Sequence, residues 1–215
     1  MENMLKVLDA HFKLEKKEVG EFAKIKVKGM NFTIERYYAN GLGNVSIMRA
    51  AGFFGLMKMD TLIINPIECD APLFSYDRVL AMGNDTLMLE LFNTVLGEAD
   101  LEGLRKVNKE NEALPEHDMG THWYAHIKYP ESAAKKGKKK DSAAFDKMAS
   151  DYFKEYVKAA KNAPVCDKAE KLEKASVYVE GLLSNGGPST DVFKQHYGEE
   201  KTAYLFRKVL FGTQA

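Results

Sequence analysis

The stretch SYDRVLAMGNDTLMLELF, residues 75–92, predicts two antiparallel β-strands and decides the fold class. Gly83, Asn84 and Asp85 lie between its two halves, and this composition is typical of a tight hairpin turn. The second half, LMLELF, is apolar on both strand faces and therefore needs cover on both sides of the sheet. Asp77 places a carboxyl group in the middle of the first half. That residue is either a charge tolerated at the rim of a core or a group held there for chemistry.

Four segments that precede this hairpin also have strand character. The clearest is FAKIKVKG, residues 22–29, where Ile25 and Val27 alternate with lysines, as in a strand with one face in water. The other segments are residues 30–41, 44–52 and 55–66, the last of which stops at Pro66. Short connections between the segments indicate an antiparallel meander of about six strands.

Helical periodicity dominates the rest of the chain. Residues 1–14 predict a short N-terminal helix, and residues 141–163 predict a long one with Asp141 at its N-cap. One face of the long helix carries an apolar stripe of Phe145, Met148, Ala149, Tyr152, Tyr156 and Ala160. Residues 168–185 and 189–212 predict two or three more helices, broken by NGGP and by Gly198. We therefore expect one domain, residues 1–215, with a three-layer α/β/α sandwich around the antiparallel sheet.

Composition limits the classes of function. The chain has 31 Lys plus Arg and 31 Asp plus Glu, so no overall field favours nucleic acid or a membrane as partner. Cys69 and Cys166 form no disulfide framework and no repeated metal-ligand spacing. No stretch approaches the roughly 20 apolar residues of a membrane span. We expect a soluble, cytoplasmic protein.

Common catalytic motifs are missing from the sequence. It has neither a Gly-rich phosphate loop nor a Gly-x-Ser-x-Gly elbow. His117, His122 and His126 lie close together, but no thiolate is near them, and we expect no metal site.

Two basic features leave alternatives open. The run Lys135–Lys140 is either a solvated loop or a docking surface for an acidic partner or a substrate carboxylate. Arg49 interrupts an apolar strand, and it either extends to the sheet edge or binds an anionic ligand.

Residues 64–93 resemble the core of the ferredoxin-dependent bilin reductases, where a proline turn and a Leu-Pro-Leu/Ile-Phe-Gly-x-Asp segment lead into a strand and hairpin. The matching residues, in order, are Pro66, Pro72, Leu73, Phe74 and Asp77. Glu90 lies where the family usually carries an acid in the following strand. Residues 114–136 resemble the family's tryptophan-containing strand, with Trp123, and residues 151–164 and 196–212 resemble its long aromatic helix and its closing helix.

The resemblance implies a radical enzyme without flavin or metal. Such an enzyme passes single electrons from reduced ferredoxin, or flavodoxin, to a linear tetrapyrrole held between the sheet and the C-terminal helices. Asp77 would donate protons, because a carboxyl group beside a pigment in a desolvated cleft has a raised pKa. Lys135 or Lys136 would lie near a substrate propionate, lysine patches would meet the acidic ferredoxin, and the enzyme would act as a monomer. A related group that acts on red chlorophyll catabolite shares this fold.

Departures from the family pattern define the remaining candidate residues. Thr61 stands where several members carry a histidine, and Arg49 stands near a position that is glutamate in some members. Glycines replace the family's Asn-Asp pair near the C-terminus, so Asp191 becomes the candidate substitute. Phe74 and Ser75 complete the expected substrate-binding set. The alternative function is a bilin-binding or carrier protein that keeps the cleft without the chemistry; an unrelated sandwich is the third reading.

Overall fold

The computed structural model of the protein describes residues 1–214 and contains one antiparallel sheet of eight strands. The strands follow the order β1-β3-β4-β5-β6-β7-β8, and β2 pairs with β3. Their bounds are β1 Leu14–Lys17, β2 Lys24–Val27, β3 Met30–Ala39, β4 Gly43–Gly52, β5 Met57–Pro66, β6 Leu73–Ala81, β7 Asn84–Phe92 and β8 Ala133–Lys138. From β3 to β7 each strand pairs with the next along the chain, which confirms the antiparallel meander.

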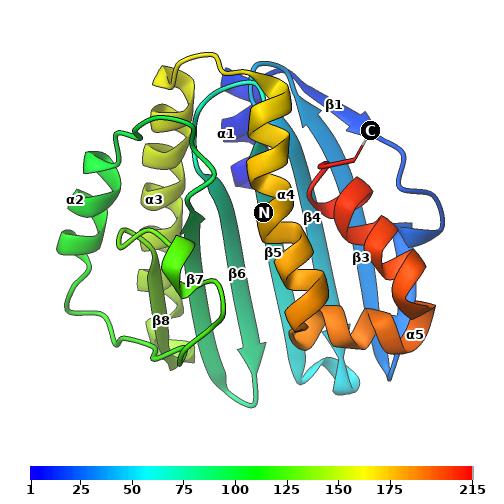
Figure 1. Cartoon of the computed structure of the whole chain (residues 1–215). Helices are drawn as coiled ribbons and strands as arrows, with labels where there is room; N and C mark the ends of the chain where they lie inside the picture. The colour runs from blue at the N-terminus through cyan, green and yellow to red at the C-terminus, as the bar shows by residue number, and fades with distance from the viewer. Residues whose placement is uncertain (215) are drawn as a thin grey trace.

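Helices cover both faces of the sheet, so the predicted sandwich is confirmed (Figure 1). On one face lie α1 (Glu2–His11) and α3 (Ser142–Asn162), with α2 (Glu102–Glu110) packed beside α3. On the other face lie α4 (Lys168–Asn185), α5 (Pro188–Tyr204) and a π-helical segment, η5 (Leu205–Leu210). Every residue of the predicted apolar stripe on α3 is buried. Gly198 interrupts the helical geometry of α5, as expected.

The hairpin of residues 75–92 forms with a shorter turn than the sequence indicates. Ala81 pairs with Asn84, so Met82 and Gly83 make the turn, both with positive φ (51° and 75°). Positive φ at both central residues is the geometry of the favoured two-residue hairpin. Asn84 and Asp85, expected in the turn, belong to β7, and the Asp85 carboxylate is buried in an ion pair with Arg78.

Alternation along β6 directs its side chains to different layers. Leu73 belongs to the core beneath α4 and η5, whereas Phe74 and Tyr76 belong to the core beneath α1 and α3. By the same alternation, Ser75 and Asp77 face the α4 layer. We call this side the α4 face and the opposite side the α3 face.

Two strands beyond the expected six complete the sheet. β1 is a short edge strand, and β8 is formed by the start of the lysine run. Lysines are common on edge strands because they discourage pairing with another chain. A run of lysines in a sequence therefore does not by itself distinguish a loop from an edge strand. Trp123, by contrast, precedes a short 3-10 turn, Ala125–Ile127, and the strand expected around it is not formed. Across residues 1–214, every helix is too short or too polar to cross a bilayer.

Candidate active site

Asp77 lies in the middle of β6 and is held by two hydroxyl groups. Thr61 on β5 is its direct cross-strand partner, and the Thr61 Oγ1 donates a hydrogen bond of 2.5 Å to Asp77 Oδ1. Ser75, two residues earlier on the same face, donates from Oγ to Asp77 Oδ2 at 3.0 Å. Both carboxyl oxygens are therefore positioned. The Thr61 side chain therefore contacts the aspartate directly.

The electrostatics of this position favour a protonated carboxyl group. In the described part of the chain, no Lys, Arg or His side chain forms an ion pair with Asp77, although its side chain keeps some contact with solvent. Burial is the largest influence on the Asp77 pKa and raises it, while the hydrogen bonds from Thr61 and Ser75 lower it. The net result is a raised pKa. A carboxyl group in this state can carry a proton at a higher pH than a free aspartate does.

A second acid, Glu90, lies on the adjacent strand β7, across from Ser75 and on the same face of the sheet as Asp77. Ser75 pairs directly with Glu90 on β7, and the Glu90 side chain is buried. Burial raises the Glu90 pKa, as does the nearby Asp77, while Lys128 lowers it from 3.4 Å away. Lys128 is a site residue that the sequence did not reveal, because it lies in an aperiodic loop and approaches β7 only through an isolated bridge to Phe92.

Aromatic side chains gather on the α4 face around Phe92, two residues after Glu90 on β7. Tyr178 of α4 stacks on Phe92 with a centroid separation of 4.2 Å and on Trp123 at 5.8 Å. Burial raises the pKa of Tyr124 and Tyr178, and both Glu90 and Asp77 raise it further. A layer of aromatic rings beside acids is suited to a planar, conjugated ligand.

Trp123 is packed tightly and carries an unused donor. Its Nε1 is buried without a hydrogen-bond partner among the described groups. The ring lies so close to Gly181 of α4 that a Cβ there would fall 2.1 Å from Trp123 Cη2. Gly181 therefore permits the contact between the Trp123 loop and α4. A ligand carbonyl beside this ring would satisfy the indole N–H.

The register separates three predicted substrate-binding residues from Asp77. Arg49 pairs with Asp60, the neighbour of Thr61, so it lies on the α3 face, where it binds Glu35 at 2.7 Å. Phe74 and Lys135 lie on that face too. The expectation that Arg49, Phe74 and Lys135 line one space with Asp77 is therefore corrected, because neighbouring positions on a strand face opposite ways.

The surroundings of Phe74 and Lys135 support the same correction. Phe74 is fully buried and stacks on Tyr156 of α3 at 4.7 Å. Lys135 is only 3% exposed and forms an ion pair with Glu116. Both side chains are thus occupied within the protein, and we leave them out of the site.

Asp191 is on the same side of the sheet as Asp77 but over different strands. It is an exposed residue in the first turn of α5, and α5 packs on β3 through Phe193 and Phe32, whose centroids are 5.2 Å apart. Three strand spacings separate β3 from β6, which is about 14 Å. The structure therefore does not bring Asp191 beside Asp77.

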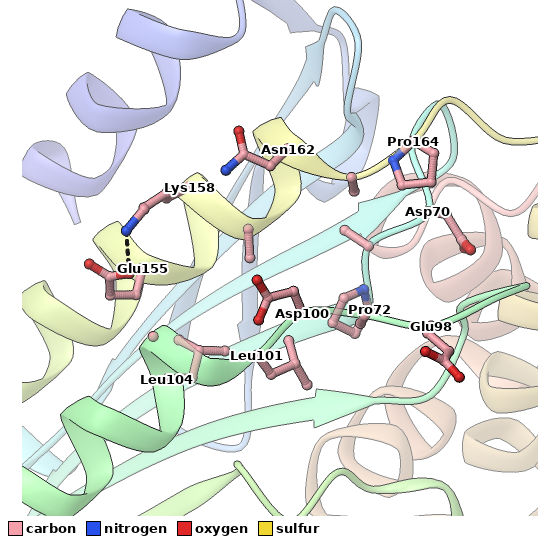
Figure 2. Close-up of a pocket in the computed structure, with 15 residues that line it drawn as sticks. Asp70, Pro72, Glu98, Asp100, Leu101, Leu104, Glu155, Lys158, Asn162 and Pro164 are labelled. Atoms are coloured by element: carbon pink, nitrogen blue, oxygen red, sulfur yellow. Dashed lines mark hydrogen bonds and ion pairs between the residues drawn. The ribbon is translucent and has the colours of Figure 1, made fainter.

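A separate cavity of about 260 Å³ lies on the α3 side of the molecule (Figure 2). Its lining includes Glu98, Asp100 and Glu155, with Lys158 Nζ 3.3 Å from the Glu155 carboxylate. A ligand that carries carboxylates would be repelled by this acidic lining.

Within residues 1–214, no three His, Cys, Asp or Glu side chains converge as metal ligands. The three loop histidines therefore do not form a metal site with one another or with nearby acids.

Comparison with known proteins gives a likeness of fold. No protein-family model matches the sequence, and no curated protein matches it. Among solved structures, phytochromobilin synthase from tomato in complex with biliverdin superposes with a TM-score of 0.78 and 14% sequence identity. The match covers 99% of this chain and 81% of the tomato chain. The protein therefore shares its fold with the tomato protein, which was crystallised in complex with the linear tetrapyrrole biliverdin.

Proposed function

We propose that the protein is a ferredoxin-dependent reductase of a linear tetrapyrrole, biliverdin or a related bilin, with Asp77 as proton donor. The observation that carries the proposal is the Asp77 carboxyl group, held by Thr61 and Ser75 with a raised pKa and without a cationic partner in the described chain. The fold shared with tomato phytochromobilin synthase supports the substrate class. The sequence resemblance to the bilin reductases supports the electron donor.

The chemistry assigns distinct tasks to donor and protein. Reducing one double bond of a bilin requires two electrons and two protons. Ferredoxin delivers the electrons one at a time. Asp77 gives the pigment one proton for each electron and is reprotonated between the two steps from solvent, with which it keeps some contact. Thr61 and Ser75 hold the carboxyl group in place through both states. The pigment lies on the α4 face in this proposal, with its rings against Trp123, Tyr124 and Tyr178.

A bilin-binding protein without catalysis is the second candidate. Thr61 favours it, since its hydroxyl group can orient Asp77 but cannot carry a proton at neutral pH as the family's histidine does. The two candidates share the binding site and differ only in turnover.

Mixing the purified protein with biliverdin tests binding first. We expect the visible absorption band of biliverdin to shift on binding, because the pigment moves from water into an aromatic, acidic site. Under anaerobic conditions, reduced ferredoxin should then convert the bound pigment through radical intermediates, visible by absorption and electron paramagnetic resonance. A band shift without conversion would support the carrier. No band shift at all would remove both candidates.

Ferredoxin docking is expected to depend on the lysines that follow Lys135. Lys136, Lys138, Lys139 and Lys140 are exposed at the edge strand β8 and the turn after it. Replacing these four by glutamine should lower the rate of turnover at low salt, because complementary charge increases the rate of association. The effect should fade across a salt series. Equal rates for the variant and the wild type at low salt would exclude this surface as the docking site.

A further inference from the structure

A cavity of about 610 Å³ between β3, the turn before β2, α5 and η5 has three cations in its lining, and one of them, Lys201, forms an ion pair with Glu21. The other two are Arg36 on β3 and Lys208 on η5, both half-buried. Apolar walls come from Val19, Phe22 and Val209, together with the ring of Tyr204. This volume and this mixture of apolar walls with a few charged groups are those of a small-molecule site.

Arg36 is held in place without a carboxylate. Its Nε donates to Asn44 Oδ1 at 2.6 Å, and Asn44 Nδ2 donates in turn to the Leu210 carbonyl at 2.9 Å. In the part of the chain that the structure describes, the guanidinium group has no acidic side chain within ion-pair distance, and its two terminal nitrogens donate no hydrogen bond. Burial lowers the Arg36 pKa, as expected for a cation that lacks a counter-ion. The two terminal nitrogens of the Arg36 guanidinium group are therefore available to donate hydrogen bonds to a ligand.

Three acidic residues also line the cavity, and one of them, Glu18, follows Lys17, the strand partner of Arg36. Glu21 is neutralised by Lys201, whose Nζ is 3.1 Å from both carboxylate oxygens. Glu18 and Glu200 also line the cavity, next to η1 (Gly20–Ala23) and on α5. Lys208, like Arg36, forms no ion pair with a described residue. Arg36 and Lys208 are thus the two cations of the lining that form no ion pair with a described residue.

This cavity is distinct from the Asp77 site. Arg36 and Ser75 lie in one row across the sheet, with Ser46 and Ile63 between them. Three strand spacings make about 14 Å. Ser46 Oγ donates to the Leu210 carbonyl at 2.8 Å, so η5 packs on β4 between the two sites, and Ile63 is buried in the same core.

We propose that this cavity binds a small molecule that combines an aromatic ring with a phosphate or carboxylate group. The oxyanion would accept hydrogen bonds from the two terminal nitrogens of Arg36 and from Lys208. The ring would lie against Phe22 and Tyr204, which already stack on each other with centroids 6.0 Å apart and an interplanar angle of 23°. The site requires neither a bilin nor ferredoxin.

Three naphthalene probes test the proposal on the full chain. The probes are 1-naphthyl phosphate, 1-naphthoate and neutral 1-naphthol, titrated while the methyl signals of Val19 and Val209 are followed by NMR. We expect one or both anions to shift these signals, and 1-naphthol to bind at least about tenfold more weakly than the better anion, a difference of about 1.4 kcal/mol. The stronger anion identifies the preferred group. Absence of shifts at both valines with every probe would overturn the proposal, as would equal binding of the three.

Two variants and a control make the test specific. Arg36→Gln and Lys208→Gln should each weaken binding of the better anion, Arg36→Gln by about tenfold or more. Arg36→Gln also removes the contact to Asn44, so Lys208→Gln supplies the result if that variant fails to fold. Lys106→Gln, at an exposed lysine of α2 on the α3 side, should bind like the wild type. The proposed anion site would be contradicted if Lys208→Gln bound the better anion like the wild type and Arg36→Gln either did the same or failed to fold.

Discussion

Asp77→Asn is expected to lower turnover of a bound bilin by about 100-fold or more, because a positioned general acid contributes about 10² to 10⁴ in rate. The amide has nearly the shape of the carboxyl group and can still accept the hydrogen bond from Thr61, so bilin affinity should stay close to that of the wild type. It has no acidic proton to give to the pigment. Anaerobic single-turnover measurements with reduced ferredoxin, followed by absorption spectroscopy, separate the rate from the affinity.

Asp60→Asn is the matched control for this variant. Asp60 lies on β5 next to Thr61, but its side chain belongs to the α3 face, where it pairs across the sheet with Arg49 and Arg78. The control should turn over bilin like the wild type. Identical rates and products for Asp77→Asn and the wild type would refute the role of Asp77 as proton donor.

Asp77→Asn should also change how the stability of the protein depends on pH, an effect that can be measured without a ligand. Because the folded protein raises the Asp77 pKa above its unfolded value of about 3.9, the native state binds the proton more tightly than the unfolded state. Wild-type stability contributed by this group is therefore lost as pH rises through the folded pKa. Asp77→Asn should gain stability relative to the wild type over that range and lose the advantage below the unfolded pKa. Urea unfolding at a series of pH values measures it, and a difference that does not vary with pH would contradict the raised pKa.

The juxtaposition of Thr61, Ser75 and Asp77 can be predicted from the sequence because it depends on local strand pairing. Thr61, Ser75 and Asp77 lie on two consecutive strands joined by a short connection, so counting residues aligns them. The sequence motif groups Phe74 with Asp77, but the two residues are three positions apart on one strand. Side chains separated by an odd number of positions point to opposite faces of a sheet, so Phe74 lies away from the site. Lys128 and Trp123 lie in a long loop without periodicity, and only tertiary packing brings them to β7 and α4.

Phe74→Ala is expected to reduce the free energy of unfolding by about 3–5 kcal/mol, the usual cost of emptying a fully buried phenylalanine site. Phe74 is 0% exposed and packs against Tyr152, Phe153 and Tyr156 of α3, so its removal leaves a cavity beneath that helix. Since this core lies on the α3 face, the affinity of the folded variant for biliverdin should equal that of the wild type. Urea unfolding gives the first quantity, and absorption titration under conditions where the variant is folded gives the second.

Phe92→Ala provides the comparison that distinguishes the two faces of the sheet. Phe92 is also 0% exposed, but it lies on the α4 face, where its ring stacks on Tyr178 at 4.2 Å and meets Tyr124 edge-on at 5.4 Å. A similar loss of stability is expected from this variant, because the same ring volume is removed from a buried position. It should in addition weaken biliverdin binding, since the aromatic layer on the α4 face loses its support. If Phe74→Ala weakened biliverdin binding as much as Phe92→Ala does, the pigment would have to contact the α3 face, and the proposed position of the site would be wrong.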